Sequence, residues 1–76
     1  MHYQKSDDQL KPYVDYVRNK EETKSTVLSL AASHGKLLES FCVYVRDVLN
    51  EKAPSLDDAV IRRIACIVLS TYGFYF

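Results

Sequence analysis

The last third of the sequence, residues 55–76, constrains the fold most because it is almost entirely apolar after Arg63. None of the thirteen residues that follow Arg63 carries a charge. Ser55 after Pro54 is a good N-cap, so we predict a helix over residues 56–72. Its polar positions fall in one narrow row, in which Asp58 and Arg62 should pair and which continues through Cys66 and Ser70. Such a helix is buried on most of its circumference.

The middle of the chain has a regular apolar pattern that predicts one long helix over residues 26–52, with Thr23 or Ser25 as its cap. One face is formed at alternating steps of four and three by Val27, Ala31, His34, Leu38, Phe41, Val45 and Val48. Because this phase continues through Gly35, we expect an unbroken helix, with a break or kink at Gly35 as the alternative. Pro54 then turns the chain, which makes the two long helices antiparallel neighbours.

The N-terminal part completes the predicted architecture. Residues 1–9 are interpreted as a lead-in, and a shorter amphipathic helix is predicted over residues 10–20, fading into a charged, solvated connector. The fold class is therefore all-α: a small three-helix bundle in a single domain, residues 1–76, with an aromatic tail at residues 73–76. We expect the centre of its core to contain Leu38, Phe41, Val45, Ile61, Ile64 and Val68.

The predicted C-terminal helix has more apolar surface than one short bundle can cover. A 76-residue chain buries only roughly 60% of the surface it exposes when unfolded. We therefore expect a symmetric homodimer that completes the bundle through Ile67, Tyr72, Phe74, Tyr75 and Phe76. Gly73 suits a left-handed helix end, which would fold Phe74 back on the last turn. Alternatively, these aromatic residues fold over Tyr13 and Tyr16 to complete a monomer core, or they bind a different protein.

The residue types that carry catalysis are sparse in this sequence. The only glycines are Gly35 and Gly73, which excludes a glycine-rich phosphate loop. Cys42 and Cys66 are interpreted as small core thiols, with a disulfide between their helices as the alternative. Neither cysteine stands at a ligand spacing from a histidine, so we expect no metal and no cofactor. His34 lies eight residues from Cys42 on the predicted helix, too far for a thiol–imidazole pair.

Charge and length narrow the remaining function classes. Ten Lys and Arg balance ten Asp and Glu, so no overall field attracts nucleic acid or an anionic membrane. The N-terminal residues lack an apolar signal region, which favours a cytoplasmic protein. We expect a non-enzymatic adaptor, inhibitor or regulator, as phage-encoded proteins of this size can be, that binds an unidentified protein partner. The alternatives are a nucleic-acid-binding regulator, recognisable by salt-sensitive binding, and a peripheral membrane protein, recognisable by liposome flotation.

Overall fold

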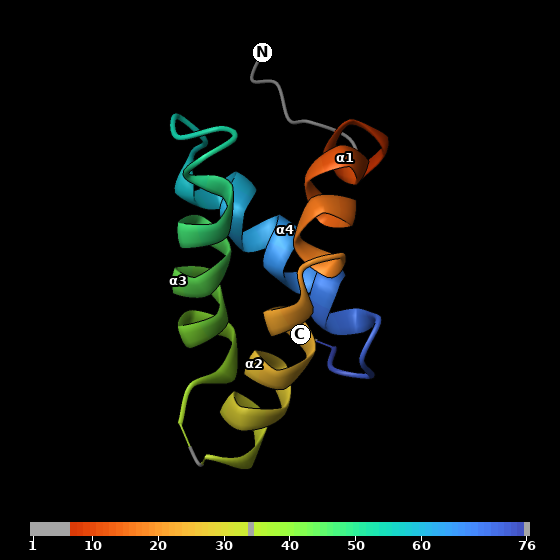
Figure 1. Ribbon diagram of the computed structural model, residues 1–76, viewed down its shortest axis with the longest axis vertical. Coiled ribbons are helices and arrows are strands. Elements are labelled where there is room, and N and C mark those ends of the chain that lie inside the picture. The colour runs from red at the N-terminus through yellow and green to blue at the C-terminus, as the bar shows by residue number, and fades with distance from the viewer. Residues whose placement is uncertain (1–6, 34, 76) are drawn as a thin grey trace.

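The computed structural model describes residues 7–33 and 35–75, and these residues form four helices (Figure 1). The helices are α1 (Asp7–Arg18), α2 (Glu21–Ala32), α3 (Leu37–Leu49) and α4 (Asp58–Ser70). No strand occurs within the described residues, so the predicted all-α class is confirmed. The number of helices differs from the three predicted.

The prediction of one long helix over residues 26–52 is wrong, because the chain breaks between α2 and α3. Ser33 adopts an extended conformation, and its backbone N–H donates to the Ser29 carbonyl at 3.3 Å. Its hydroxyl donates to the Leu30 carbonyl at 3.0 Å, so two C-terminal carbonyls of α2 are satisfied without further helix. Lys36 is also extended and caps α3 through its backbone. The apolar period of the sequence runs through Gly35 although the helix does not, so periodicity alone could not reveal the break. Ala31, which the predicted helix placed on its apolar face, is exposed.

The beginning of α2 also differs from the prediction, which placed Thr23 or Ser25 at a helix cap near residue 26. The helix begins at Glu21 with Lys20 as its extended N-cap residue, and no side chain caps it. The Lys20 N–H donates to the Val17 carbonyl at 3.2 Å, which closes α1 and leaves a two-residue link. The expected solvated connector is thus largely helical, and its acidic residues occupy the first turn, where the helix dipole favours them.

Thr23 has a different role from the predicted cap. Its side chain is fully buried in the first turn of α2, and its hydroxyl donates to the Val17 carbonyl at 2.5 Å. The same hydroxyl lies 2.8 Å from the Tyr44 hydroxyl on α3. One buried oxygen therefore connects the end of α1, the start of α2 and the middle of α3.

The core lies where α4 crosses the other helices. All four helices contribute to it, and α4 packs against both α3 and α1 (Figure 1). The six residues predicted for its centre are all buried, which confirms that prediction. Among the residues that the structure describes, the buried apolar set is Leu10, Val14, Val17, Val27, Leu38, Phe41, Val45, Leu49, Ile61, Ile64, Ala65, Val68 and Leu69.

The sequence prediction was wrong for the start of α4 and correct for its C-terminal end. Ser55 is not the cap, because the helix begins at Asp58 and the preceding Asp57 accepts a hydrogen bond from the backbone N–H of Ile61. The C-terminal end is as predicted: Gly73 has a left-handed φ of 92°. The Phe74 and Gly73 N–H groups donate to the Leu69 and Ser70 carbonyls, both at 3.1 Å, which is the Schellman arrangement.

Candidate protein-interaction site

The aromatic end of α4 contains the residues predicted to form an interface. Ile67, Tyr72 and Phe74 are partly buried and pack against the core of their own chain. Tyr75 instead has 80% of its surface exposed. Phe76 lies outside the described residues. The prediction of a dimer interface here remains a prediction, and Tyr75 is the described member of the set that is most available to a partner.

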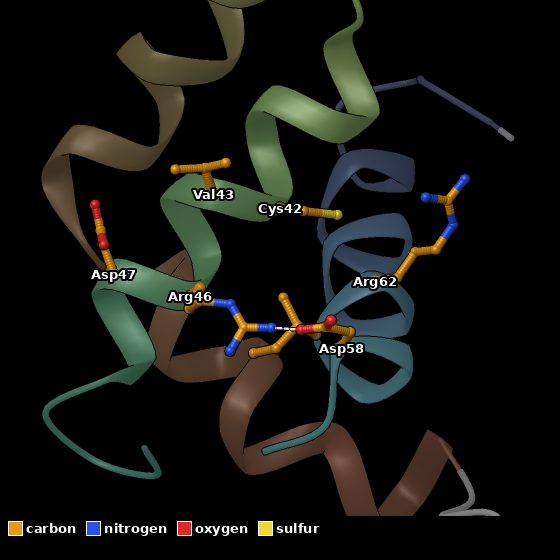
Figure 2. Close-up of a pocket in the computed structure, with 7 residues that line it drawn as sticks. Cys42, Val43, Arg46, Asp47, Asp58 and Arg62 are labelled. Carbon is orange, nitrogen blue, oxygen red and sulfur yellow. Dashed lines mark hydrogen bonds and ion pairs between the residues drawn. The ribbon is translucent and has the colours of Figure 1, made fainter. Parts of the chain in front are cut away.

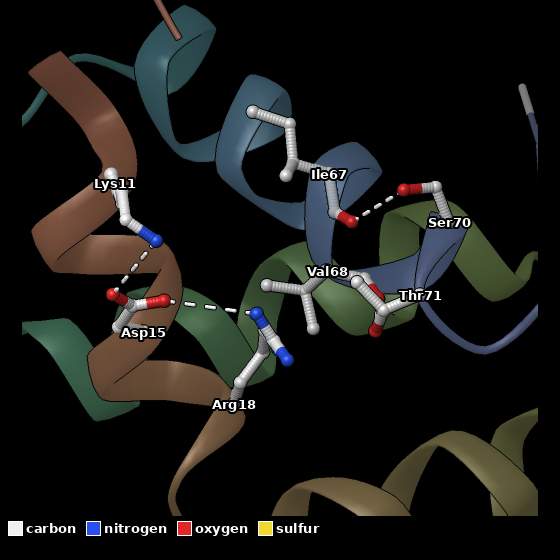
Figure 3. Close-up of polar contacts among 7 residues, drawn as sticks. All are labelled: Lys11, Asp15, Arg18, Ile67, Val68, Ser70 and Thr71. Carbon is white, nitrogen blue, oxygen red and sulfur yellow. Dashed lines mark hydrogen bonds and ion pairs between the residues drawn. The ribbon is translucent and has the colours of Figure 1, made fainter. Parts of the chain in front are cut away.

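The turn that presents Tyr75 is held by several hydrogen bonds. The hydroxyls of Ser70 and Thr71 donate hydrogen bonds to the carbonyls of Ile67 and Val68, at 2.6 and 2.7 Å (Figure 3). Together with the Schellman bonds, these contacts fix the last turn, and the partly buried side chain of Phe74 anchors the residue before Tyr75. The phenol ring is therefore carried on a defined backbone rather than on a fraying helix end.

A second surface, not predicted from the sequence, is a groove of about 290 Å³ between α3 and α4 (Figure 2). Its lining residues are Cys42, Val43, Arg46, Asp47, Asp58, Ile61 and Arg62. Val43 has 64% of its surface exposed although it is apolar. A sequence signal existed, because Val43 falls outside the apolar rows of its helix, among the polar positions Glu39, Ser40, Arg46 and Asp47. We call this surface the α3–α4 groove.

The charges around the α3–α4 groove are arranged differently from the prediction. Asp58 pairs with Arg46 on α3 and not with Arg62, its predicted partner four residues along α4. Because α4 begins at Asp58, this carboxylate lies beside the last turn of α3, where Arg46 reaches it (Figure 2). No salt bridge within the described part of the chain involves Asp47 or Arg62. The rim of the groove therefore carries one ion pair, Arg46–Asp58, and two further charges that form no salt bridge with the described residues.

The two cysteines are free thiols, both half-buried against the core. Burial raises the pKa of the Cys42 thiol above its ordinary value, although the positive charge of Arg62 acts in the opposite direction. The Cys42 thiol is therefore protonated near neutral pH, which is the unreactive form. From the sequence, we excluded a thiol–imidazole pair between His34 and Cys42. His34 lies outside the described residues.

The basic residues of α1 and the following link contact groups of their own chain. Lys11 and Arg18 both bridge to Asp15, at 3.5 and 3.7 Å (Figure 3). The Tyr16 ring has Lys20 and Lys52 nearby, with their Nζ atoms 5.0 and 5.1 Å from its centroid. The Tyr16 hydroxyl oxygen, which accepts a hydrogen bond from the Lys20 ammonium, raises the pKa of Lys20. These contacts connect α1 to the loop after α3 and give no specific support for nucleic-acid binding.

The described residues also bear on two other kinds of site, a metal centre and a membrane span. Across residues 7–33 and 35–75, no three His, Cys, Asp or Glu side chains gather in a way that could hold a metal ion. None of the helices formed by these residues has the length and apolar character required to cross a membrane. No protein-family model matches the chain, and neither a curated protein nor a solved structure matches it.

Proposed function

We propose that this chain is a non-enzymatic protein-interaction module, a small adaptor, inhibitor or regulator that binds a larger protein. The observation that supports the proposal is the exposed Tyr75 side chain on a hydrogen-bonded helix end. Tyrosine is enriched in interfaces because its ring buries a large area with few rotatable bonds while its hydroxyl finds a polar partner. Fixing the backbone in advance lowers the entropic cost of binding.

The neighbouring aromatic residues support the same surface without being its main anchors. Tyr72 and Phe74 are partly buried, so each has some surface left for a partner around Tyr75. Beneath them, α4 packs against α1 and α3. The symmetric dimer predicted through this end would use the same Tyr75 side chain, and it is a rival use of the surface.

The experiment is quantitative affinity purification of the tagged chain from cells of its source organism. Three proteins are compared: wild type, Tyr75→Ser, and Leu28→Ser, a control that removes another exposed apolar side chain, on α2. We expect one protein to be retained at near-stoichiometric amounts by wild type and Leu28→Ser, and to be reduced at least about tenfold by Tyr75→Ser.

Two results would contradict the proposal. One is equal retention by all three proteins, which would show that Tyr75 does not contribute. The other is the absence of any retained protein together with sedimentation of wild type as a dimer that Tyr75→Ser dissociates. That second result would assign this end of the chain to self-association instead.

A further inference from the structure

The α3–α4 groove has a charge pattern that is complementary to itself. In Figure 2, Asp47 lies on the α3 side of the groove and Arg62 on the α4 side, with the Arg46–Asp58 pair between them. Neither Asp47 nor Arg62 forms a salt bridge among the described residues. The central ion pair therefore lies between a negative charge, Asp47, on the α3 side and a positive charge, Arg62, on the α4 side.

We propose that a second copy of this chain docks on the α3–α4 groove in a symmetric dimer. A two-fold axis that runs along the groove places Asp47 of each copy opposite Arg62 of the other, so that one rotation forms two ion pairs. The same rotation places Arg46 of each copy opposite Asp58 of the other, so opposite charges also face each other at the centre. This inference goes beyond the proposed function, because it concerns a different surface and a different partner.

Val43 supplies exposed apolar surface beside the charged groups of this contact. Its exposed side chain stands beside the groove, where Cys42 and the buried Ile61 form apolar lining. In the two-fold arrangement, Val43 of one copy faces the groove of the other. Cys42, Val43 and Ile61 therefore add apolar surface next to the charges that the rotation pairs.

Charge complementarity favours a second copy over other occupants. The groove contains two Arg and two Asp residues, so a strongly acidic or a strongly basic partner would meet like charges. The formal net charge of the chain is +0, so two copies do not repel each other at long range. A standard interface buries roughly 800 Å² per partner, a substantial part of the 5265 Å² surface of this chain. Because the contact has one exposed apolar side chain, Val43, beside surface ion pairs that contribute little, we expect a weak, concentration-dependent dimer.

The first experiment is sedimentation equilibrium of the purified chain from about 5 to about 500 µM, a range that covers weak dissociation constants. Val43→Ser is compared with Leu28→Ser, because the two apolar side chains are similarly exposed, at 64% and 56%. We expect Val43→Ser to raise the dimer dissociation constant at least about fivefold and Leu28→Ser to leave it unchanged. Far-UV circular dichroism and melting temperature verify that each variant is folded.

The second experiment exchanges the charges across the proposed axis. Asp47→Lys and Arg62→Glu each create two like-charge contacts, so each variant alone is expected to be monomeric over the same range. Mixed in equal amounts, the two variants are expected to form a heterodimer, because every contact between positions 47 and 62 then joins opposite charges. Lys24→Glu, a charge reversal on α2, is the control and should dimerise like wild type.

Four results would overturn the inference. The first three are a wild type that stays monomeric at the highest concentration, charge reversals that leave the dimer intact, and a mixture that fails to associate. Dissociation of the wild-type dimer by Tyr75→Ser but not by Asp47→Lys would also refute it, since it would place the contact at the end of α4. The partner experiment with Tyr75 is read independently, so the two proposals can fail separately.

Discussion

The hydroxyl of Thr23 provides the sharpest test of how this fold is held together. Thr23→Val replaces the hydroxyl by a methyl group of similar shape, so it removes the hydrogen bonds at 2.5 Å to Val17 and 2.8 Å to Tyr44 with little change in packing. A typical hydrogen bond contributes a net ~1 kcal/mol, which gives ~2 kcal/mol for both. The Val17 carbonyl keeps its bond from the Lys20 N–H, so we expect a cost of about 1–2 kcal/mol.

The assay is urea denaturation followed by far-UV circular dichroism. A domain of this size has a free energy of unfolding of about 4–11 kcal/mol, so the expected loss is measurable as a lower midpoint at an unchanged m-value. Tyr44→Phe removes one bond and should cost ~1 kcal/mol. Ser25→Ala removes an exposed hydroxyl on the same helix and is the matched control, expected to change stability by less than ~0.5 kcal/mol.

The double variant Thr23→Val/Tyr44→Phe decides whether the two hydroxyls interact. Because both single changes remove the same Thr23–Tyr44 bond, the double variant should cost ~1 kcal/mol less than the sum of the singles. A Thr23→Val protein within ~0.5 kcal/mol of wild type would refute the reasoning, and so would single costs that simply add.

Three further outcomes are expected. Phe41→Ala should lower the free energy of unfolding by about 3–5 kcal/mol, measured by urea denaturation, because the ring is fully buried; a loss under ~1 kcal/mol would contradict this. Gly35→Ala should stabilise by ~0.5 kcal/mol, since an added Cβ makes an ordinary contact with the Ser33 Oγ at 3.9 Å. Gly73→Ala should destabilise by ~1 kcal/mol or more, because its φ of 92° strains any residue with a Cβ; effects of equal sign would contradict the pair. In a Cys66→Ser background, iodoacetamide should alkylate Cys42 with a midpoint pH above that of a model thiol, because burial raises the pKa of Cys42; a midpoint below the model value would disagree. The free energy of unfolding should fall as pH rises from the pKa of Cys42 in the unfolded chain towards its higher pKa in the folded protein.

The all-α class, the core residues and the C-terminal end of α4 were predictable because each follows from the types and spacing of residues within one helix. The four-residue spacing of Phe41 and Val45, and of Ile64 and Val68, predicts an apolar face on each helix, and all four residues are buried. Gly73 was the one residue near the C-terminus that tolerates a left-handed conformation without strain, and it occupies that position.

The features missed by sequence reasoning depend on contacts between helices. The break after Ser33 leaves the apolar phase unchanged, so the pattern fits one helix or two. The partner of Asp58 depends on where α4 begins relative to α3, which no spacing within α4 reveals. The exposed position of Val43 was detectable as an apolar residue on a polar face. An exposed apolar residue of this kind indicates a binding surface but does not identify the partner that binds there.

The packing of α1 against α4 has a consequence for the order of folding. Contacts between consecutive helices close short loops, whereas the α1–α4 contact joins segments some forty residues apart in the chain. Closing a longer loop costs more entropy, although the cost grows only logarithmically with length. We therefore expect the neighbouring helix pairs to form first and the α1–α4 contact to close last. Substitutions at Leu10 or Val14 should then act mainly by accelerating unfolding and leave the folding rate nearly unchanged.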